Sequence, residues 1–236
     1  MSALPTLHAD GSCVVCVKPA GLLVHNAAWA GPREETALDI ARAAHGRDLV
    51  PVHRLDRGTS GVLVLARGGE SARAWQSALA RDDADKRYLA LVRGALVAHA
   101  RVEHAFADER GARRDALTLI EPLCACAEPR CSLVLARPIT GRTHQVRRHL
   151  KHLSHPVIGD ANYGKGAINR EFAARFGLAR LALHAWSLRV AHPVTGAACE
   201  WCAPLPEDLA APLARIFSEA RTSPAGGWAP PHGSSA

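Results

Sequence analysis

One short segment of the 236-residue chain combines a carboxylate, guanidinium groups and the small residues of a tight turn. It runs from His53 to Gly61, and Asp56 stands between Arg54 and Arg57. Glycine and small hydroxyl residues permit a tight turn and let a ligand approach the backbone. Nearby cations favour the charged form of a carboxylate, so Asp56 is a candidate nucleophile or base. The segment alone also allows a structural Asp that pins a turn and pairs with arginine.

A tyrosine at the start of a predicted strand is a second candidate. Tyr88 follows Lys86 and Arg87 and precedes a short apolar run. In that position a tyrosine is commonly half-buried core. Against an RNA pocket it could instead stack on a base or lend its hydroxyl to proton transfer.

The third candidate region is basic. Between Pro129 and Gly159 there is no Asp or Glu, and apolar residues at helical spacing predict a helix over residues 143–153. Arg147 and Lys151 would share one flank of it, where unpaired like charges cost stability unless an anion is supplied. The whole chain carries a formal charge of +7, which fits a polyanionic partner. Phosphate contact is therefore favoured over a merely solvated helix face.

Neither the cysteines nor the clustered histidines predict a metal site. Cys13 and Cys16, like Cys199 and Cys202, have the spacing of a zinc knuckle, but in a strand such positions point to opposite faces. An odd number of cysteines, seven, does not suggest a disulfide framework. The histidines of the basic helix drift around its surface with no acidic residue near them. We expect no metal and no disulfide.

Apolar patterning supplies the elements that position these residues. Continuous or alternating apolar runs predict strands, and apolar residues at helical spacing predict helices. Strands interleaved with few helices indicate an α+β domain with a mixed or mostly antiparallel sheet. Cys124, Cys126 and Cys131 are expected in a loop. We expect one catalytic domain over residues 1–220 and a disordered Pro/Gly/Ser-rich tail over residues 221–236. The predicted strands are 12–18, 62–66, 88–92, 132–136 and 181–190, and the other predicted helices are 35–45, 70–82 and 207–220.

Taken together and in this order, these segments resemble the RluA family of pseudouridine synthases. The likeness covers residues 8–205, and so many motifs in one order do not arise by chance. Its TruC subgroup, which modifies uridine 65 in the T stem of tRNA, is the most similar, because no S4 RNA-binding domain precedes the first strand and a double arginine follows Val146. An insertion over residues 169–178 also resembles that subgroup. The motifs are His53 to Asp56 with Thr59 to Gly61, Lys86 to Tyr88, Gly141 to Arg147, His155 to Asp160, Leu181 to Ala185, and His192 to Gly196.

The resemblance implies a pseudouridine synthase fold with a catalytic cleft across a central sheet, and an isomerisation that needs no cofactor or metal. Asp56 would be the catalytic carboxylate, Tyr88 would stack on the uracil, and Arg147 would pair with Asp56. Arg54 would hold the flipped-out site open, and Leu183 would form part of an apolar floor. Further substrate contacts are expected from Arg142, His144, Gln145, Arg148 and Lys151.

Two alternatives stay open at this stage. One is an rRNA target for the same chemistry, and the other is a non-catalytic RNA-binding protein or chaperone that keeps the fold. The chain has no apolar run long enough for a membrane span and no secretory leader pattern, which predicts a cytoplasmic protein. We expect RNA as the partner, and a monomer with no obligatory protein partner.

Overall fold

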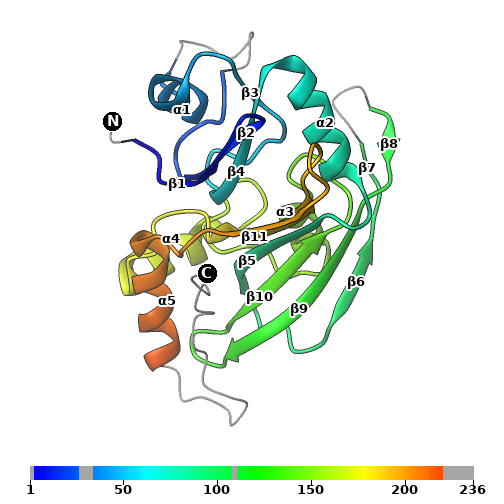
Figure 1. Cartoon of the computed structure of the whole chain (residues 1–236). Coiled ribbons are helices and arrows are strands. Elements are labelled where there is room, and N and C mark those ends of the chain that lie inside the picture. Colours follow the sequence, from blue (N-terminus) through cyan, green and yellow to red (C-terminus); the bar gives the residue numbers. More distant parts are fainter. Residues whose placement is uncertain (1–2, 27–33, 108–110, 220–236) are drawn as a thin grey trace. The chain divides into compact units, whose positions relative to one another are not determined.

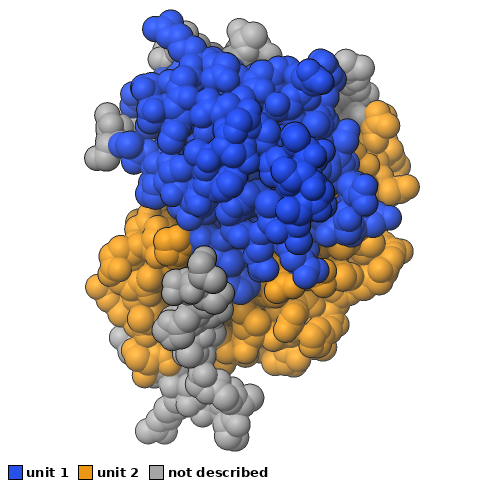
Figure 2. Space-filling view, in the orientation of Figure 1, with its two compact units in different colours: residues 1–85, 185–203 blue, residues 86–184, 204–236 orange. Residues whose placement is uncertain are grey.

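The computed structural model describes residues 3–26, 34–107 and 111–219 (Figure 1). The chain divides into two compact units. Unit 1 comprises residues 1–85 and 185–203, and unit 2 comprises residues 86–184 and 204–236 (Figure 2). Helices and strands occur in both units, so the predicted α+β class is confirmed. The predicted tail over residues 221–236 lies outside the described residues.

Unit 1 is built on a sheet whose recorded strand pairs are antiparallel. Its neighbours run in the order β1, β2, β4 and β11, with β3 pairing β4 and β12 pairing β11. The pairs β1–β2, β2–β4, β3–β4 and β11–β12 are all antiparallel. The strands are β1 (Thr6–Ala9), β2 (Cys13–Lys18), β3 (Leu49–Pro51), β4 (Ser60–Arg67), β11 (Leu183–Ala191) and β12 (Ala198–Cys202).

Two helices pack on this sheet. α1 (Ala37–His45) begins after Thr36, whose hydroxyl accepts from the Asp39 backbone N–H while the Asp39 carboxylate accepts from Thr36, a capping box. α2 (Gly68–Ala80) buries the stripe predicted for it, in which Trp75 is fully buried. The core of unit 1 gathers this stripe, the inner residues of β2 and β4, and Trp201 of β12.

Gly61 allows the close approach of β4 to β11. Its φ of +122° lies in the region that side chains rarely adopt. A Cβ at this position would stand 2.1 Å from the carbonyl oxygen of Ala185. Only glycine therefore fits directly after the turn that carries Asp56.

Unit 2 contains an antiparallel sheet in the order β5, β10, β9 and β6. A separate two-stranded sheet pairs β7 with β8. Tyr88 of β5 stands opposite Ala136 of β10. The strands are β5 (Asp85–Arg93), β6 (Ala100–Glu103), β7 (Phe106–Ala107), β8 (Arg113–Arg114), β9 (Leu117–Cys126) and β10 (Cys131–Pro138).

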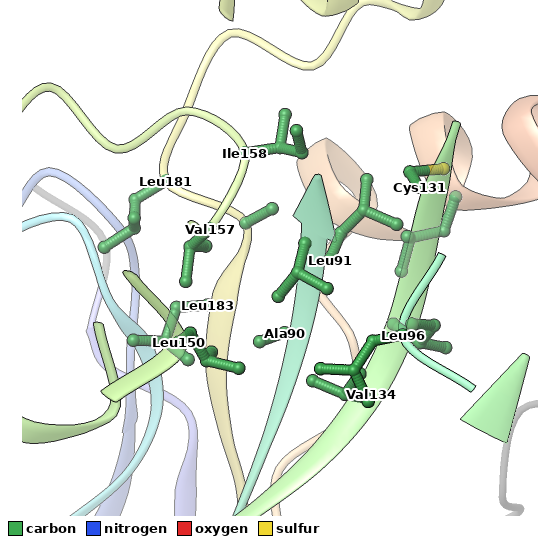
Figure 3. Close-up of a cluster of buried hydrophobic side chains, with 14 of the residues drawn as sticks. Ala90, Leu91, Leu96, Cys131, Val134, Leu150, Val157, Ile158, Leu181 and Leu183 are labelled. Atoms are coloured by element: carbon green, nitrogen blue, oxygen red, sulfur yellow. The ribbon is translucent and has the colours of Figure 1, made fainter. Parts of the chain in front are cut away.

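Three helices belong to unit 2: α3 (Gln145–His152), α4 (Gly166–Phe176) and α5 (Glu207–Glu219). Its core combines the inner residues of β5 and β10, of which Leu91 and Val134 are 1% and 0% exposed, with Leu150 of α3 and the segment around Ile158 (Figure 3). Leu183 is part of this core. The apolar spacing that predicted the helix over residues 143–153 thus reflects a buried face of α3.

The predicted loop position of the cysteines is wrong. Cys124 and Cys126 belong to β9 and Cys131 to β10, where Cys131 stands opposite Cys126. The register between these strands shifts between Leu133 and Val134. A polar residue and a proline, Glu121 and Pro122, interrupt the apolar pattern of β9, which is why the pattern did not predict a strand there.

Among the residues that the structure describes, no helix is both long enough and apolar enough to span a bilayer.

Candidate active site

Asp56 lies in the turn between β3 and β4 of unit 1, half-buried. The backbone N–H of Thr59 donates to the Asp56 carbonyl at 3.0 Å and closes the turn. On the other side of the turn, the His53 ring accepts from the Val64 N–H at 3.0 Å. Thr59 is buried, and in the described part of the chain its hydroxyl oxygen finds no hydrogen-bond partner. The carboxylate therefore stands on a backbone anchored at both ends.

A buried lysine also anchors this turn through hydrogen bonds. Lys18 is 0% exposed, and its ammonium donates to the carbonyls of Pro19, Leu22 and Arg57 at 2.8, 2.7 and 3.3 Å. The Arg57 carbonyl also accepts from the Gly21 N–H at 2.8 Å. Buried charges are tolerated only when they are hydrogen-bonded in this way. Lys18 is not among the predicted site residues, although a lysine at the end of an apolar strand is a visible signal in the sequence.

Arg57 follows Asp56 in the sequence, but its guanidinium contacts other groups. Its guanidinium donates to the Glu34 carboxylate at 2.8 and 3.2 Å and to the Gly21 carbonyl at 3.0 Å. Adjacency in the chain therefore overstated the contribution of Arg57 to the environment of Asp56. Arg54 is exposed.

In unit 2, Tyr88 is half-buried and packs against the core, as its place in β5 dictates. Lys86, two residues earlier on the same strand, is also half-buried, and burial lowers its pKa. Leu183 is buried at 3% exposure. Tyr88 thus combines an apolar packing surface with a hydroxyl.

Arg147 is buried and forms a bidentate ion pair with Asp160. Its Nε lies 2.7 Å from Asp160 Oδ2 and its second amino group lies 2.8 Å from Oδ1. Oδ1 also accepts from the backbone N–H groups of Asn162 and Tyr163, at 2.9 and 3.0 Å. Burial alone would raise the pKa of Asp160, but the hydrogen bonds from Arg147 and these amides hold it below its usual value.

This pair corrects the prediction that Arg147 and Lys151 share a flank of unpaired charge. The anion for Arg147 is the carboxylate of Asp160, the residue directly after the stretch from Pro129 to Gly159 that has no Asp or Glu. Lys151 is exposed, so the two cations lie in different environments.

The Arg147 pair extends to Tyr163 and His144. The Arg147 guanidinium carbon lies 5.1 Å from the centroid of the Tyr163 ring, and the Tyr163 hydroxyl lies 3.0 Å from His144 Nδ1. His144 begins α3 with a left-handed φ of 55°. The sequence motifs include Asp160 but do not predict its pairing with Arg147, and they do not include Tyr163. The available signal was the position of both residues shortly after the stretch from Pro129 to Gly159 that has no Asp or Glu.

Two further residues that were predicted to contact the substrate, Gln145 and Arg142, form hydrogen bonds within the protein. The Gln145 side chain is buried, and its oxygen accepts from the Thr140 hydroxyl and the Arg142 N–H at 2.7 and 3.0 Å. Its amide nitrogen donates to the Leu117 carbonyl and the Thr118 hydroxyl at 2.9 and 3.0 Å. Gln145 therefore fixes the start of α3. Arg142 is exposed, and its Nε donates to the Asp115 carbonyl at 3.1 Å.

Arg148 and its neighbours form a ring-lined basic cluster in unit 2. The Arg148 guanidinium carbon lies 3.8 Å from the centroid of Phe106 on β7. The rings of His104 and His152 stack at 4.2 Å. The nearby cations and burial lower the pKa of His104, with burial the larger cause. We refer to Phe106, Arg148, His104 and His152 as the ring-lined cluster.

Comparison with known proteins decides the family. A family model described as RNA pseudouridylate synthase matches residues 12–152. The chain belongs to the RNA pseudouridylate synthase family. The matched region contains the Asp56 turn, Tyr88 and Arg147, whereas Asp160 and Tyr163 follow it.

Curated relatives and solved structures agree. The chain is 37% identical over 213 residues to the tRNA pseudouridine synthase C of Vibrio vulnificus, covering 81% of this chain and 86% of that protein. It is 38% identical over 217 residues to the protein of that name from Yersinia pestis, covering 83% and 84%. Among solved structures, Human RNA Pseudouridylate Synthase Domain Containing 4 matches with a TM-score of 0.71 at 25% identity, covering 90% of this chain and 92% of that one. Human RNA Pseudouridylate Synthase Domain Containing 1 gives 0.69 at 26%, covering 87% and 86%. The chain is thus an RNA pseudouridine synthase, an isomerase, with the fold of that family.

Proposed function

We propose that this enzyme converts one uridine of tRNA, uridine 65 in the T stem, into pseudouridine, with Asp56 as the catalytic carboxylate. The relatives named tRNA pseudouridine synthase C support the substrate, because the likeness extends over most of both chains. The Asp56 turn is the observation on which the catalytic assignment depends. It presents a half-buried carboxylate on a backbone fixed by Lys18 and by the Thr59 N–H.

A rigid turn suits this chemistry because the carboxylate must act on one atom of a nucleotide that has left its stack. Extruding the uridine from a stem costs about a few kcal/mol, which binding must supply. Asp56 then either attacks the nucleoside or removes a ribose proton. The glycosidic bond breaks, the uracil rotates, and a bond to carbon 5 replaces it. The carbon-5 proton is lost and a ring nitrogen gains one, so atoms balance without a cofactor.

We assign the remaining roles in the reaction to Tyr88, Leu183, Arg147 and Arg54. Tyr88 stacks on the uracil and assists loss of the carbon-5 proton, and Leu183 contributes apolar surface. Arg147 keeps Asp56 ionised, and its own orientation is set by Asp160 through two parallel hydrogen bonds. Asp160 and Tyr163 therefore act as positioning residues for Arg147. His144 extends the same group through the Tyr163 hydroxyl. Arg54 holds the flipped-out site open.

RNA contact is assigned to the exposed cations at the two ends of α3. Arg142 is exposed before its first turn and Lys151 is exposed in its last. Arg148 is preorganised on Phe106, so it loses little side-chain freedom when it meets a phosphate or a base. Phosphate contacts set the register of a folded RNA and do not read its sequence. We further propose that the enzyme is a cytoplasmic monomer of one catalytic domain, residues 1–220, and needs no protein partner.

Mapping of pseudouridine across all tRNA and rRNA, in cells with and without the gene, tests the substrate. We expect one pseudouridine to disappear from the T stem, and to return with wild-type enzyme but not with Asp56→Asn. Loss of an rRNA pseudouridine with every tRNA position intact would overturn the tRNA assignment. If no position changes, and purified enzyme forms no product on either RNA, a non-catalytic RNA-binding role replaces the proposal.

A further inference from the structure

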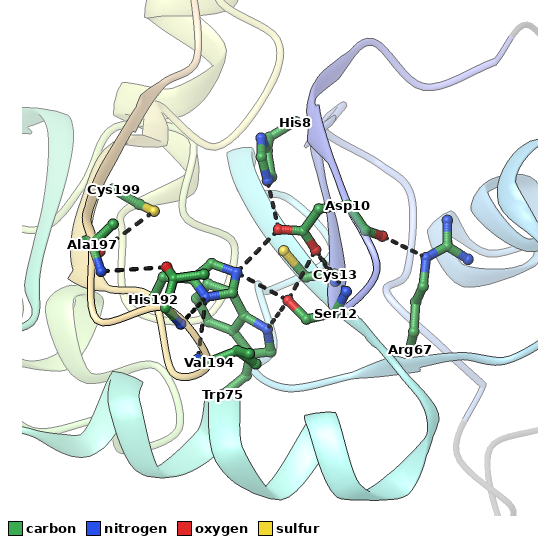
Figure 4. Close-up of polar contacts among 11 residues, drawn as sticks. His8, Asp10, Ser12, Cys13, Arg67, Trp75, His192, Val194, Ala197 and Cys199 are labelled. Atoms are coloured by element: carbon green, nitrogen blue, oxygen red, sulfur yellow. Dashed lines mark hydrogen bonds and ion pairs between the residues drawn. The ribbon is translucent and has the colours of Figure 1, made fainter.

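A cluster of metal-binding side chains lies at the first hairpin of unit 1. His8 belongs to β1, Asp10 to the turn that follows, and Cys13 is the first residue of β2. One nitrogen, one oxygen and one sulfur from these residues lie within 4.8 Å of one another. Across the described ranges this is the only such group of three metal-binding residues. Figure 4 draws His8 and the Cys13 sulfur on either side of the Asp10 carboxylate.

The hairpin turn fixes the carboxylate. Asp10 Oδ1 accepts from the Ser12 N–H, the Ser12 hydroxyl and the Cys13 N–H, at 2.7, 2.9 and 2.8 Å. The same contacts set the backbone of Cys13 relative to Asp10. Two of the three ligands are therefore preorganised, and the third, His8, already meets Oδ2 at 2.9 Å.

His192 contacts Oδ2, the second carboxylate oxygen of Asp10. Its Nδ1 accepts from the backbone N–H groups of Val194 and Thr195, at 3.2 Å each, so its proton resides on Nε2. Nε2 lies 3.0 Å from Asp10 Oδ2 and 3.1 Å from the Ser12 hydroxyl. A hydrogen-bond donor behind a ligating carboxylate is the usual outer partner of a metal site. The same geometry excludes a Ser–His–Asp triad, which needs Asp and Ser on opposite ring nitrogens.

The donor set selects the type of cation. An imidazole nitrogen, a carboxylate oxygen and a thiolate sulfur suit zinc, whereas calcium and magnesium prefer oxygen ligands alone. One carboxylate and one thiolate neutralise a divalent charge, which a partly buried site requires. The side chains of His8 and Asp10 are 36% and 30% exposed, so an ion can reach them from solvent.

Cys13 is a thiol until a metal displaces its proton. Burial, followed by the charge of Asp10, raises its pKa to about 12. On binding, Cys13 releases one proton to solvent and His8 moves its proton from Nε2 to Nδ1. The ion takes the place of the His8–Asp10 hydrogen bond.

We propose that His8, Asp10 and Cys13 bind one Zn²⁺ ion, with water as the fourth ligand, and that the ion clamps the β1–β2 hairpin. Ser12 connects the site to α2, because the indole N–H of Trp75 donates to its hydroxyl at 3.3 Å. A ligand that binds only the folded state stabilises it by mass action, so the ion raises the stability of unit 1. This proposal does not rest on the RNA chemistry.

Equilibrium dialysis of the metal-stripped full chain against Zn²⁺, followed by elemental analysis, gives the stoichiometry. Competition with a chromophoric chelator gives the Kd, and Co²⁺ reports a thiolate ligand by its charge-transfer absorption. We expect one Zn²⁺ per chain, and a Kd raised by about 10- to 100-fold or more in His8→Ala and in Cys13→Ser. Added Zn²⁺ should raise the Tm of the wild type more than that of His8→Ala at the same Zn²⁺ concentration.

Cys124→Ser is the matched control, because this half-buried thiol lies in unit 2 outside the group. It should bind Zn²⁺ like the wild type. Since His8 is partly exposed, His8→Ala should retain the metal-free Tm, which separates ligand loss from unfolding. The proposal is overturned if the wild type binds no stoichiometric Zn²⁺, if both ligand variants bind it unchanged, or if binding is lost in Cys124→Ser.

Discussion

Arg147 and Asp160 form a buried, bidentate ion pair whose partners are 8% and 0% exposed. The pair joins the middle of α3 to the segment before α4. Two backbone N–H groups also donate to the carboxylate, so both buried charges have hydrogen-bond partners. A buried pair of this kind adds little net stability, but removal of one partner leaves the other charge buried without compensation.

Asp160→Asn should therefore be strongly destabilising. An amide cannot match the guanidinium with two charge-assisted acceptors, and we expect a loss of about 3–5 kcal/mol in the free energy of unfolding. Urea denaturation followed by far-UV circular dichroism measures it. Asp83→Asn is the control: Asp83 meets Arg81 at 3.0 Å on the surface, where solvent screens the pair and its loss should change stability far less. Equal losses in the two variants would contradict the burial argument.

The same comparison should depend on pH in one direction. The folded pKa of Asp160 lies below its ordinary value of 3.8. The ionised carboxylate therefore stabilises the fold above that value, and this contribution is lost as pH falls through the folded pKa. The stability difference between wild type and Asp160→Asn should be constant from about pH 6 to 8 and shrink below about pH 4. A difference that grows on acidification would refute the assignment.

Where the sequence predicted an element correctly, the pattern that indicated it is local. A continuous apolar run sufficed for β4, and the spacing of Ala72, Trp75 and Leu79 sufficed for α2. β9 was missed because Glu121 and Pro122 interrupt its apolar pattern near a register shift that depends on its partner strand.

The candidate site was predictable only in part, for the same reason. Asp56 and Tyr88 were recognisable from residue type and motif. The partner of Arg147 was not, because Asp160 is brought to it by the turn around Gly159. Likewise, Arg57 adjoins Asp56 in the chain, yet its guanidinium meets Glu34. The His8–Asp10–Cys13 group required the hairpin, since spacing alone does not place two strands and a turn around one point.

Charge reversal at Arg148 and Lys151 of α3 should weaken RNA binding more than catalysis. For Arg148→Glu with Lys151→Glu we expect a KM raised by about tenfold or more and a kcat changed by less than about threefold. The slope of log binding constant against log salt should fall by about one per lost phosphate contact. Arg81→Glu, which breaks only a surface pair, is the control. A lower kcat at unchanged KM would place these residues in the chemistry instead.

Removal of metal should leave catalysis intact. The proposed isomerisation gains and loses no atoms, and the hairpin site is expected to act on stability alone. We expect the chelator-treated enzyme to keep its kcat on tRNA within about twofold at temperatures well below its Tm. Treatment of exposed thiols with an alkylating reagent should be equally harmless. Loss of activity that Zn²⁺ restores, at a temperature where the metal-free fold is intact, would require a metal in the chemistry.

Asp56 should be indispensable for product formation and dispensable for folding and RNA affinity. The carboxylate is half-buried, and its turn is anchored by the Thr59 N–H and by the Lys18 ammonium. We therefore expect Asp56→Ala and Asp56→Asn to lower kcat by about a thousandfold or more, while the Tm and the Kd for tRNA stay near the wild-type values. Product is measured on unmodified tRNA transcripts with protein purified from a host that lacks its own enzyme for this position. Lys18→Met is the informative comparison, because it leaves the carboxylate in place and removes the ammonium that holds the turn. It should lower the Tm and reduce kcat in proportion to the disorder of the turn, without abolishing product. Wild-type turnover by Asp56→Asn would remove Asp56 from the mechanism, whatever the family resemblance suggests.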